Sequence, residues 1–292
     1  MTAGGYVLEP YEPADREAYL GLLHAAWEER TMSADVFDWW FGGNPAGSLM
    51  SVARVGPQVV GVAAHSLARM VLEGEERLVS FSVHATTHES ARGRGIFAAL
   101  ERKHEHEAQE RGAAVVLAFA SAPTAPIFLG PLGWMEIGRL RVWARPLLSQ
   151  APGPATAVRF EQAGDAAADW PNHVVRDAEY LTWRFVDSPR GYRVVGADGA
   201  YAVVGKTRYR GIETAVLADF AGGSKDVLRR AVSIADGRAM IALPAPEQRR
   251  LFLSLGFVPA PHTLHLMGKP LAGKLDLAPA AWRFTLGDTD FW

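Results

Sequence analysis

The sequence predicts a mixed α/β protein made of two domains with related organisation. Its 292 residues exceed the roughly 150 residues that are typical of one domain. A proline-, glycine- and alanine-rich stretch at 149–157 separates two segments of alternating apolar residues, which places the domains at residues 1–148 and 157–292. The sequences IFL and LGW at 127–134 reappear as LFL and LGF at 251–257. This local repeat indicates that the two domains are related.

Apolar periodicity predicts the elements of the first domain in order. Leu20 and Leu23 follow a helical spacing, whereas the residues around Gly56-Pro57 and the acidic turn at 73–76 alternate as in strands joined by tight turns. The predicted elements are a strand at 6–8, a helix at 15–27, strands at 49–55, 59–72 and 78–85, a helix at 94–111, a strand at 113–120, a short helix at 126–129 and a strand at 135–144. The three central strands should form an antiparallel meander.

The second domain is predicted to repeat part of this order. Turn residues at Asp198-Gly199 and Arg210-Gly211 divide a second meander. The predicted elements are a strand at 157–160, a helix at 178–185, strands at 192–196, 200–204 and 213–219, a helix at 225–235, a strand at 239–243, a helix at 247–255 and a strand at 263–267.

Composition excludes several classes of protein. Thirty basic and thirty-two acidic residues leave a net charge of −2, which disfavours a protein whose main partner is nucleic acid or an anionic membrane. The chain has no cysteine, which rules out disulfides, a thiolate nucleophile and cysteine-ligated metals. It shows no signal peptide and no run of 18 apolar residues. We therefore expect a cytoplasmic protein without a membrane partner.

The most informative motif is RGRG at 92–95, which follows a β-rich run and precedes an amphipathic helical pattern. Glycines permit a tight turn that exposes successive backbone N–H groups, and a helix N-terminus attracts anions. Arg92 and Arg94 add charged donors, so the loop is suited to a diphosphate. The alternatives from these four residues alone are a solvated surface turn or an RNA-binding segment.

Thr87-His88 followed by RGRG resembles the acyl-CoA loop of the GNAT superfamily of N-acetyltransferases, whose pattern is Arg/Gln-x-x-Gly-x-Gly/Ala between the fourth strand and the third helix. Arg92 and Gly95 match this pattern, and Phe97 stands at its last position. The second half, with YLTWRF at 180–185 and the tail WRFTLGDTDFW at 282–292, resembles the degenerate C-terminal copy of tandem members. The resemblance implies a mixed, mostly antiparallel sheet flanked by helices, in two copies.

The resemblance also implies where acetyl-CoA binds as cosubstrate. Backbone groups of Ala85 and Thr87 would pair with the pantetheine arm, and Ser121, with Thr124 nearby, stands where many members have a pantetheine-binding asparagine. The diphosphate would be held by the amides of Arg92, Gly93, Arg94, Gly95, Ile96 and Phe97. The second copy has only AGGS at 221–224, so we expect one acetyl-CoA per chain.

Direct attack of an amine on the thioester requires a base and an acid. His84 is the first candidate base, because strand alternation places it on the same face as Ser82 and imidazole accepts a proton near neutral pH. The alternative is a half-buried structural histidine. In one branch of the tandem family the terminal carboxylate is the base, which makes Trp292 the second candidate, with simple docking of the tail as its alternative. The usual acid is a tyrosine, and Leu129 stands at that position.

Two further clusters have both functional and structural interpretations. Trp39 and Trp40, within FDWWF at 37–41, could line the acceptor pocket or belong to a helix that packs on the sheet. His104 and His106 are two residues apart on a helix and therefore face away from one another. We expect no metal site there.

The resemblance to this superfamily implies an acetyl-CoA-dependent N-acetyltransferase, and we expect it to act on a small primary amine. Leu129 raises a first alternative, a non-catalytic acyl-CoA-binding or regulatory module. A second alternative is an aminoacyl-tRNA-dependent transferase, which is also built from paired GNAT-like domains and would require a basic groove.

Overall fold

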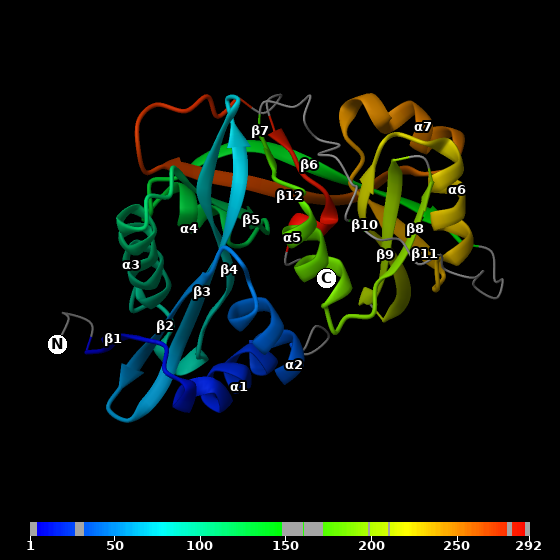
Figure 1. The fold of residues 1–292 in the computed structure, drawn as a ribbon. Helices are drawn as coiled ribbons and strands as arrows, with labels where there is room; N and C mark the ends of the chain where they lie inside the picture. Colours follow the sequence, from blue (N-terminus) through cyan, green and yellow to red (C-terminus); the bar gives the residue numbers. More distant parts are fainter. Residues whose placement is uncertain are drawn as a thin grey trace. The chain divides into compact units, whose positions relative to one another are not determined.

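The computed structural model describes residues 5–26, 32–147, 160, 172–197, 199–209, 211–278 and 282–289. The chain divides into two compact units, whose helices and strands are labelled in Figure 1. Unit 1 comprises residues 1–69, 77–138 and 265–277, and unit 2 comprises residues 70–76, 139–264 and 278–292. The predicted linker at 149–157 lies outside the described residues.

The sheet of unit 1 is mostly antiparallel. Its strands follow the order β1 (Val7–Pro10), β2 (Ser48–Val55), β3 (Gln58–Leu72), β4 (Glu75–Thr87), β5 (Val115–Ala120) and then β12 (Val258–Pro270), which pairs with β5 through residues 265–270. The pairs β1–β2, β2–β3 and β5–β12 are antiparallel, whereas β4–β5 is parallel. A strand from late in the sequence therefore completes the first sheet.

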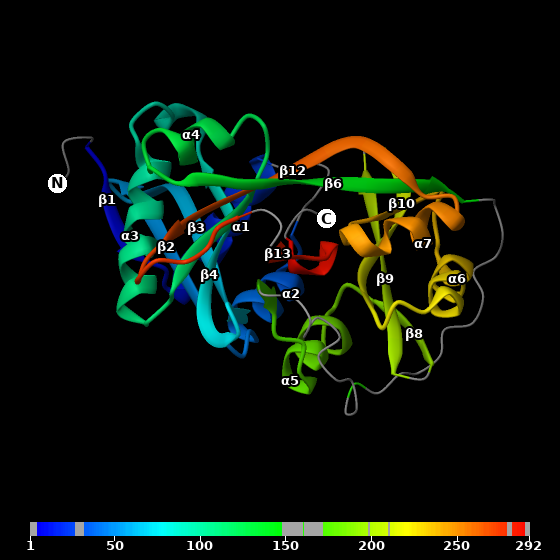
Figure 2. The ribbon, with the colours of Figure 1, turned by 90° about the horizontal axis from the view of Figure 1, so that it is seen from above.

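Helices flank this sheet. They are α1 (Arg16–Ala26), α2 (Ala34–Phe37), the π-type turn η2 (Asp38–Gly42), α3 (Ile96–Glu110) and α4 (Ala125–Leu129), with short 3-10 turns η1 (Pro13–Asp15) and η3 (Glu89–Ala91). Figure 2 shows α3 lying beside the strands of unit 1. Ile96 and Leu100 of α3 are buried against the sheet at Gly61, where an added Cβ would lie 2.6 Å from the Ile96 side chain. Glycine at this position permits the close packing of helix and strand.

Unit 2 contains further strands of mixed direction, with their own helices. Its strands follow the order β8 (Arg193–Ala197), β9 (Ala200–Tyr209), β10 (Ile212–Ala221), β11 (Ala239–Ala242) and β6 (Met135–Pro146), with only β10–β11 parallel in this path. Its helical elements are α5 (Ala178–Leu181), η5 (Thr182–Val186), α6 (Lys225–Ile234), η6 (Pro246–Gln248) and α7 (Arg249–Ser254). Side chains of β9, β10 and α6 form its apolar core.

Three short elements of unit 2 were absent from the sequence prediction. β7 (Asn172–Val174) pairs in parallel with β13 (Trp282–Arg283) and antiparallel with Met70–Leu72, and η8 (Leu286–Asp288) follows β13. Two to four residues are too few to show a periodic pattern. The predicted fold class, a mixed and mostly antiparallel sheet flanked by helices, is confirmed. None of the described helices combines the length and the apolar character needed to cross a membrane.

Candidate functional site

The parallel strands β4 and β5 of unit 1 separate partway along their length. Their pairing runs from Val79 opposite Val115 to Ser82 opposite Ala118 and extends no further. Beyond it, β4 continues through His84 to Thr87 and β5 ends at Ala120. The backbone edges of β4 after Ser82 are therefore not bonded to β5. We call the end of the pairing, at Ser82 and Ala118, the apex of the β4–β5 gap.

The loop after β4 exposes backbone N–H groups at the start of α3. Gly93 and Gly95 adopt positive φ angles of 77° and 75°, and Gly95 is the N-cap of α3. In the described part of the chain the amides of residues 93–97 donate no hydrogen bond. A Cβ on either glycine would meet nothing within 4 Å. Unsatisfied amides at the positive end of a 15-residue helix form a site with the chemistry needed to bind an anion.

The two arginines of this loop are exposed and bend back onto its backbone. Nε of Arg92 donates to the carbonyl of Thr87 at 3.3 Å, and Nη2 of Arg94 donates to the carbonyl of Ser90 at 3.3 Å. The amide of His88 donates to Val60 at 2.8 Å and so holds the loop to β3. The loop is thus fixed at its base while its charged groups stay accessible.

Of the remaining predicted cofactor contacts, Ala85 and Thr87 lie on β4 beyond the apex. The Oγ1 atom of Thr87 is buried and has no hydrogen-bond partner among the described residues. A buried hydroxyl without a partner is unusual, because such groups normally pair. Ser121 and Thr124 lie in the turn after β5, where their hydroxyl oxygens are 3.0 Å apart. The structure therefore brings these two residues together.

His84 leaves the face that strand alternation predicts. It has a φ of 48°, and its ring contacts Trp40 and Phe41 of η2 at centroid distances of 5.3 and 6.0 Å. Ser82 instead donates to Glu101 of α3. The prediction that Ser82 and His84 share a face is wrong, since the left-handed backbone at His84 interrupts the alternation. Positive φ costs a non-glycine residue about 1–3 kcal/mol and is concentrated at functional sites.

The aromatic segment at 37–41 is largely buried. Trp39 and Trp40 are 8% and 4% exposed, and their ring centroids are 5.5 Å apart. Both residues lie in η2, so this part of the segment is helical, as one of the two interpretations of the sequence expected. Trp40 nevertheless touches the candidate base His84. The structure thus places one candidate pocket residue against one candidate catalytic residue.

A buried polar network beneath α3 was not predicted from the sequence. Glu101 is fully buried and accepts from Ser82 of β4 at 2.9 Å, and its other oxygen lies 3.0 Å from Nε2 of His65 on β3. Nδ1 of His65 lies 2.8 Å from the hydroxyl of Ser80. The signal was available, because Glu101 and His104 fall on the same helix face as Ile96 and Leu100. The histidines of this helix were considered only as metal ligands.

His104 extends this network toward β2. Its Nε2 lies 2.9 Å from the hydroxyl of Ser51, and its ring contacts that of His65 at 4.7 Å. Burial lowers the pKa of His104 well below its usual value, and the neighbouring His65 and Lys103 lower it further. His104 is therefore neutral at neutral pH. The described residues include no cluster of three potential metal ligands.

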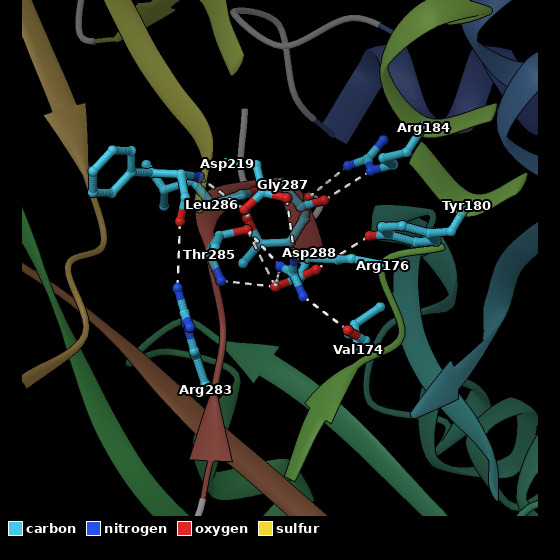
Figure 3. Close-up of polar contacts among 12 residues, drawn as sticks. Val174, Arg176, Tyr180, Arg184, Asp219, Arg283, Thr285, Leu286, Gly287 and Asp288 are labelled. Carbon is cyan, nitrogen blue, oxygen red and sulfur yellow. Dashed lines mark hydrogen bonds and ion pairs between the residues drawn. The ribbon is translucent and has the colours of Figure 1, made fainter. Parts of the chain in front are cut away.

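In unit 2 the C-terminal tail is anchored by charge (Figure 3). The carboxylate of Asp288 accepts from Nη2 of Arg176 at 2.8 Å and from the hydroxyl of Tyr180 at 3.1 Å, and Nε of Arg176 donates to Asp219 at 2.9 Å. Burial acts to lower the pKa of Arg176, but Asp219 and Asp288 outweigh it and the pKa is raised. Arg184 also donates to the carbonyl of Gly287 at 2.8 Å. The second candidate base, the terminal carboxylate of Trp292, lies outside the described residues.

The residue at the usual position of the acid, Leu129, ends α4 and is 47% exposed. Its side chain has no group that donates a proton. Nearby, Nε1 of Trp134 donates to Glu105 at 2.6 Å and Lys269 donates to the same carboxylate at 2.6 Å. The Trp134–Glu105 hydrogen bond therefore joins the segment after α4 to α3.

Residues 8–137 match the family model described as the acetyltransferase (GNAT) domain. No curated protein matches the sequence. Among solved structures, a GCN5-related N-acetyltransferase from Anabaena variabilis is 12% identical, with a TM-score of 0.65 over 91% of this chain and 73% of that one. A probable N-acyltransferase from Enterococcus faecalis is 11% identical, with a TM-score of 0.62 over 91% and 72%.

A putative acetyltransferase from Pyrococcus horikoshii is 14% identical, with a TM-score of 0.62 over 96% of this chain and 94% of that one. At these identities the likeness concerns the fold. It extends over both units of the chain.

Proposed function

We propose that this chain is an acetyl-CoA-dependent N-acetyltransferase that transfers acetyl directly to a small primary amine, through the GNAT domain at residues 8–137. The observation that carries the proposal is the run of amides at 93–97 without hydrogen-bond partners in the described part of the chain, at the N-terminus of α3. We further propose that residues 1–148 and 157–292 are two related halves of the sequence, of which the second is a degenerate GNAT-like copy; the compact units divide the chain at other residues.

The residues near the β4–β5 gap fit acetyl-CoA. The amides of residues 93–97, with Arg92 and Arg94 beside them, have the charge and the donors to hold its diphosphate. The unpartnered hydroxyl of Thr87 and the backbone edge from Ala85 to Thr87 can accept from and donate to the pantetheine amides. Ser121 and Thr124 supply hydroxyls on the other side of the gap, in the turn after β5. When bound, acetyl-CoA supplies a thioester carbonyl that an amine can attack.

For the base we propose His84, with the Trp292 carboxylate as the competing candidate. The imidazole of His84 stands on β4 two residues beyond the apex and against Trp40. A neutral imidazole there would remove the ammonium proton before attack. Trp39 and Trp40 would form the apolar wall of the acceptor site. Because Leu129 has no acidic proton, we propose that the thiolate leaves without a dedicated acid, as a thiol pKa of about 8.5 allows.

Leu129 also favours a second candidate function, a non-catalytic acyl-CoA-binding module. Both functions need the same loop, so cofactor binding alone does not separate them. Release of free thiol from acetyl-CoA with a broad panel of primary amines does. Turnover with any amine supports the transferase, whereas micromolar binding without turnover across the panel supports the module.

His84→Ala tests the assignment of the base. We expect kcat to fall by about 10²-fold, in the range typical of general-base removal, while the dissociation constant of acetyl-CoA stays within twofold. The pH dependence of kcat/KM should lose the limb that reports protonation of the base. A chain shortened by residues 290–292 gives the matched comparison, because the same loss in that variant would assign the base to the terminal carboxylate.

A further inference from the structure

One end of the buried network beneath α3 lies at Ser82 of β4. Three of its members, His65, Ser80 and Glu101, are each fully buried. Ser82 is only partly buried and is the last residue of β4 that pairs with β5. The network therefore links the interior of unit 1 to the apex of the β4–β5 gap.

Glu101 is the centre of this network. Its two carboxylate oxygens lie within hydrogen-bond distance of side chains from two strands, Ser82 at 2.9 Å and His65 at 3.0 Å. A buried carboxylate is costly unless donors satisfy it, so a helix that needed only packing would carry an apolar residue here. Glu101 lies on the helix that begins at the anion-binding loop, within two turns of Gly95. One side chain thus connects that helix to the apex.

Beyond Ser82 the backbone of β4 must hold an unfavourable conformation. His84 has a φ of 48°, and such strain persists only where surrounding contacts fix the chain. The Ser82–Glu101 hydrogen bond holds β4 to α3 immediately before this point. A change at Ser82 would therefore reach the imidazole of His84 and the backbone edge at 85–87.

We propose that Ser82 and Glu101 form a positioning pair that sets the course of β4 as it leaves β5, and thereby orients His84 and the cofactor-binding edge beyond it. The inference rests on the proposed function. It adds two residues that position the groups of that same site. Neither residue is assigned contact with acetyl-CoA or the amine. Their effect passes through the backbone from 83 to 87.

The protein offers a matched control two residues earlier on the same strand. Ser80 bonds to the same network through His65 at 2.8 Å, but it lies within the paired part of β4, opposite Val116. Ser80→Ala and Ser82→Ala each remove one hydroxyl from one buried network. A purely structural role for the network predicts equal consequences for both variants.

The test compares full-length wild type, Ser80→Ala and Ser82→Ala by melting temperature, acetyl-CoA titration, steady-state kinetics and hydrogen exchange of the 83–87 amides without ligand. We expect both variants to lower the melting temperature by similar amounts. Only Ser82→Ala should lower kcat, by about tenfold, and raise the KM for acetyl-CoA, because both His84 and the cofactor-binding edge lie beyond it. Only Ser82→Ala should accelerate exchange at 83–87.

Equal losses of kcat in the two variants, or exchange at 83–87 that matches wild type in Ser82→Ala, would overturn the proposal. The exchange experiment does not depend on turnover. A wild type that neither binds nor consumes acetyl-CoA would refute the proposed function, while exchange would still decide whether Ser82 fixes this part of β4.

Discussion

Each unit contains a strand that continues beyond the end of its parallel pairing and becomes irregular there. In unit 1 the parallel pairing of β4 ends at Ser82, and two residues later His84 interrupts the strand. In unit 2 the parallel pairing of β10 ends at Val216, and the register shifts between Leu217 and Asp219. Counted from the last residue of each strand that pairs in parallel, Ser82 and Val216, Ala218 of β10 corresponds to His84 of β4. Asp219 then corresponds to Ala85.

Beyond the interruption the two units differ. Unit 1 continues into a glycine-rich loop in which the amides of residues 93–97 donate no hydrogen bond to the described residues. In unit 2 the C-terminal tail packs along the corresponding part of β10, where Asp219 bonds Arg176 and Arg283 donates to the carbonyl of Phe220 (Figure 3). A Cβ on Gly287 would lie 2.8 Å from the carbonyl of Ala218. Beyond the end of the parallel pairing, β4 of unit 1 thus has an edge that is not bonded to β5, whereas the chain itself covers β10 of unit 2.

The largest effect should come from removing the anchor of the tail. Arg176→Met leaves the buried carboxylates of Asp219 and Asp288 without their counter-charge, and breaking such a pair typically costs about 3–5 kcal/mol. Chemical unfolding followed by the fluorescence of the chain measures the loss. Arg16→Met, which breaks the exposed pair with Asp38, serves as control and should change little. A loss of under 1 kcal/mol for Arg176→Met would show that the tail needs no ionic anchor.

The next prediction separates the two loops. Gly95 and Gly223 both precede a helix with positive φ, 75° and 62°, so aspartate strains both similarly. At Gly95, the N-cap of α3, the carboxylate would accept the exposed amides itself and repel a diphosphate. We expect Gly95→Asp to weaken acetyl-CoA binding at least 100-fold by calorimetry and Gly223→Asp by less than twofold. Similar losses in both variants would contradict a single cofactor site in unit 1.

A smaller effect tests how closely the tail fits β10. Gly287→Ala would place a methyl group 2.8 Å from the carbonyl oxygen of Ala218 and 2.9 Å from the ring of Phe185. Overpacking of this kind costs about 1–3 kcal/mol, and thermal unfolding should show it. Gly21→Ala in α1, where a Cβ meets nothing within 4 Å, is the matched control and should stabilise the helix slightly. Tolerance of alanine at 287 would indicate a loosely seated tail.

The sequence predicted the long elements well because their periodicity is local. The meander and the helices at 96–110 and 225–234 follow from alternation and from three- to four-residue spacing. Two features could not be predicted. The return of residues 265–270 to pair with β5 is a long-range contact, and the positive φ at His84 turns its side chain away from the face that simple alternation assigns to it. The turn at 92–97 could be predicted because glycines and the start of a helical pattern are features of adjacent residues.

The smallest effect concerns pH and again distinguishes the units. Burial lowers the pKa of His104 in the folded protein, so the unfolded chain binds its proton more readily. This contribution to stability is complete above the unfolded pKa of about 6.5 and is lost as pH falls. The network of unit 2 consists of Arg, Asp and Tyr side chains, which ordinarily titrate outside this range.

Between pH 7 and pH 5.5, wild type should lose about 1 kcal/mol of unfolding free energy more than His104→Gln. Glutamine retains a donor for the hydroxyl of Ser51 and does not titrate. Urea titrations of both proteins at both pH values measure the change in unfolding free energy. Contributions from titrating groups that the two proteins share cancel in the comparison. Parallel pH dependence in the two proteins would show that His104 can take up a proton without cost, and that the unit 1 network is as insensitive to mild acid as the anchor of the tail.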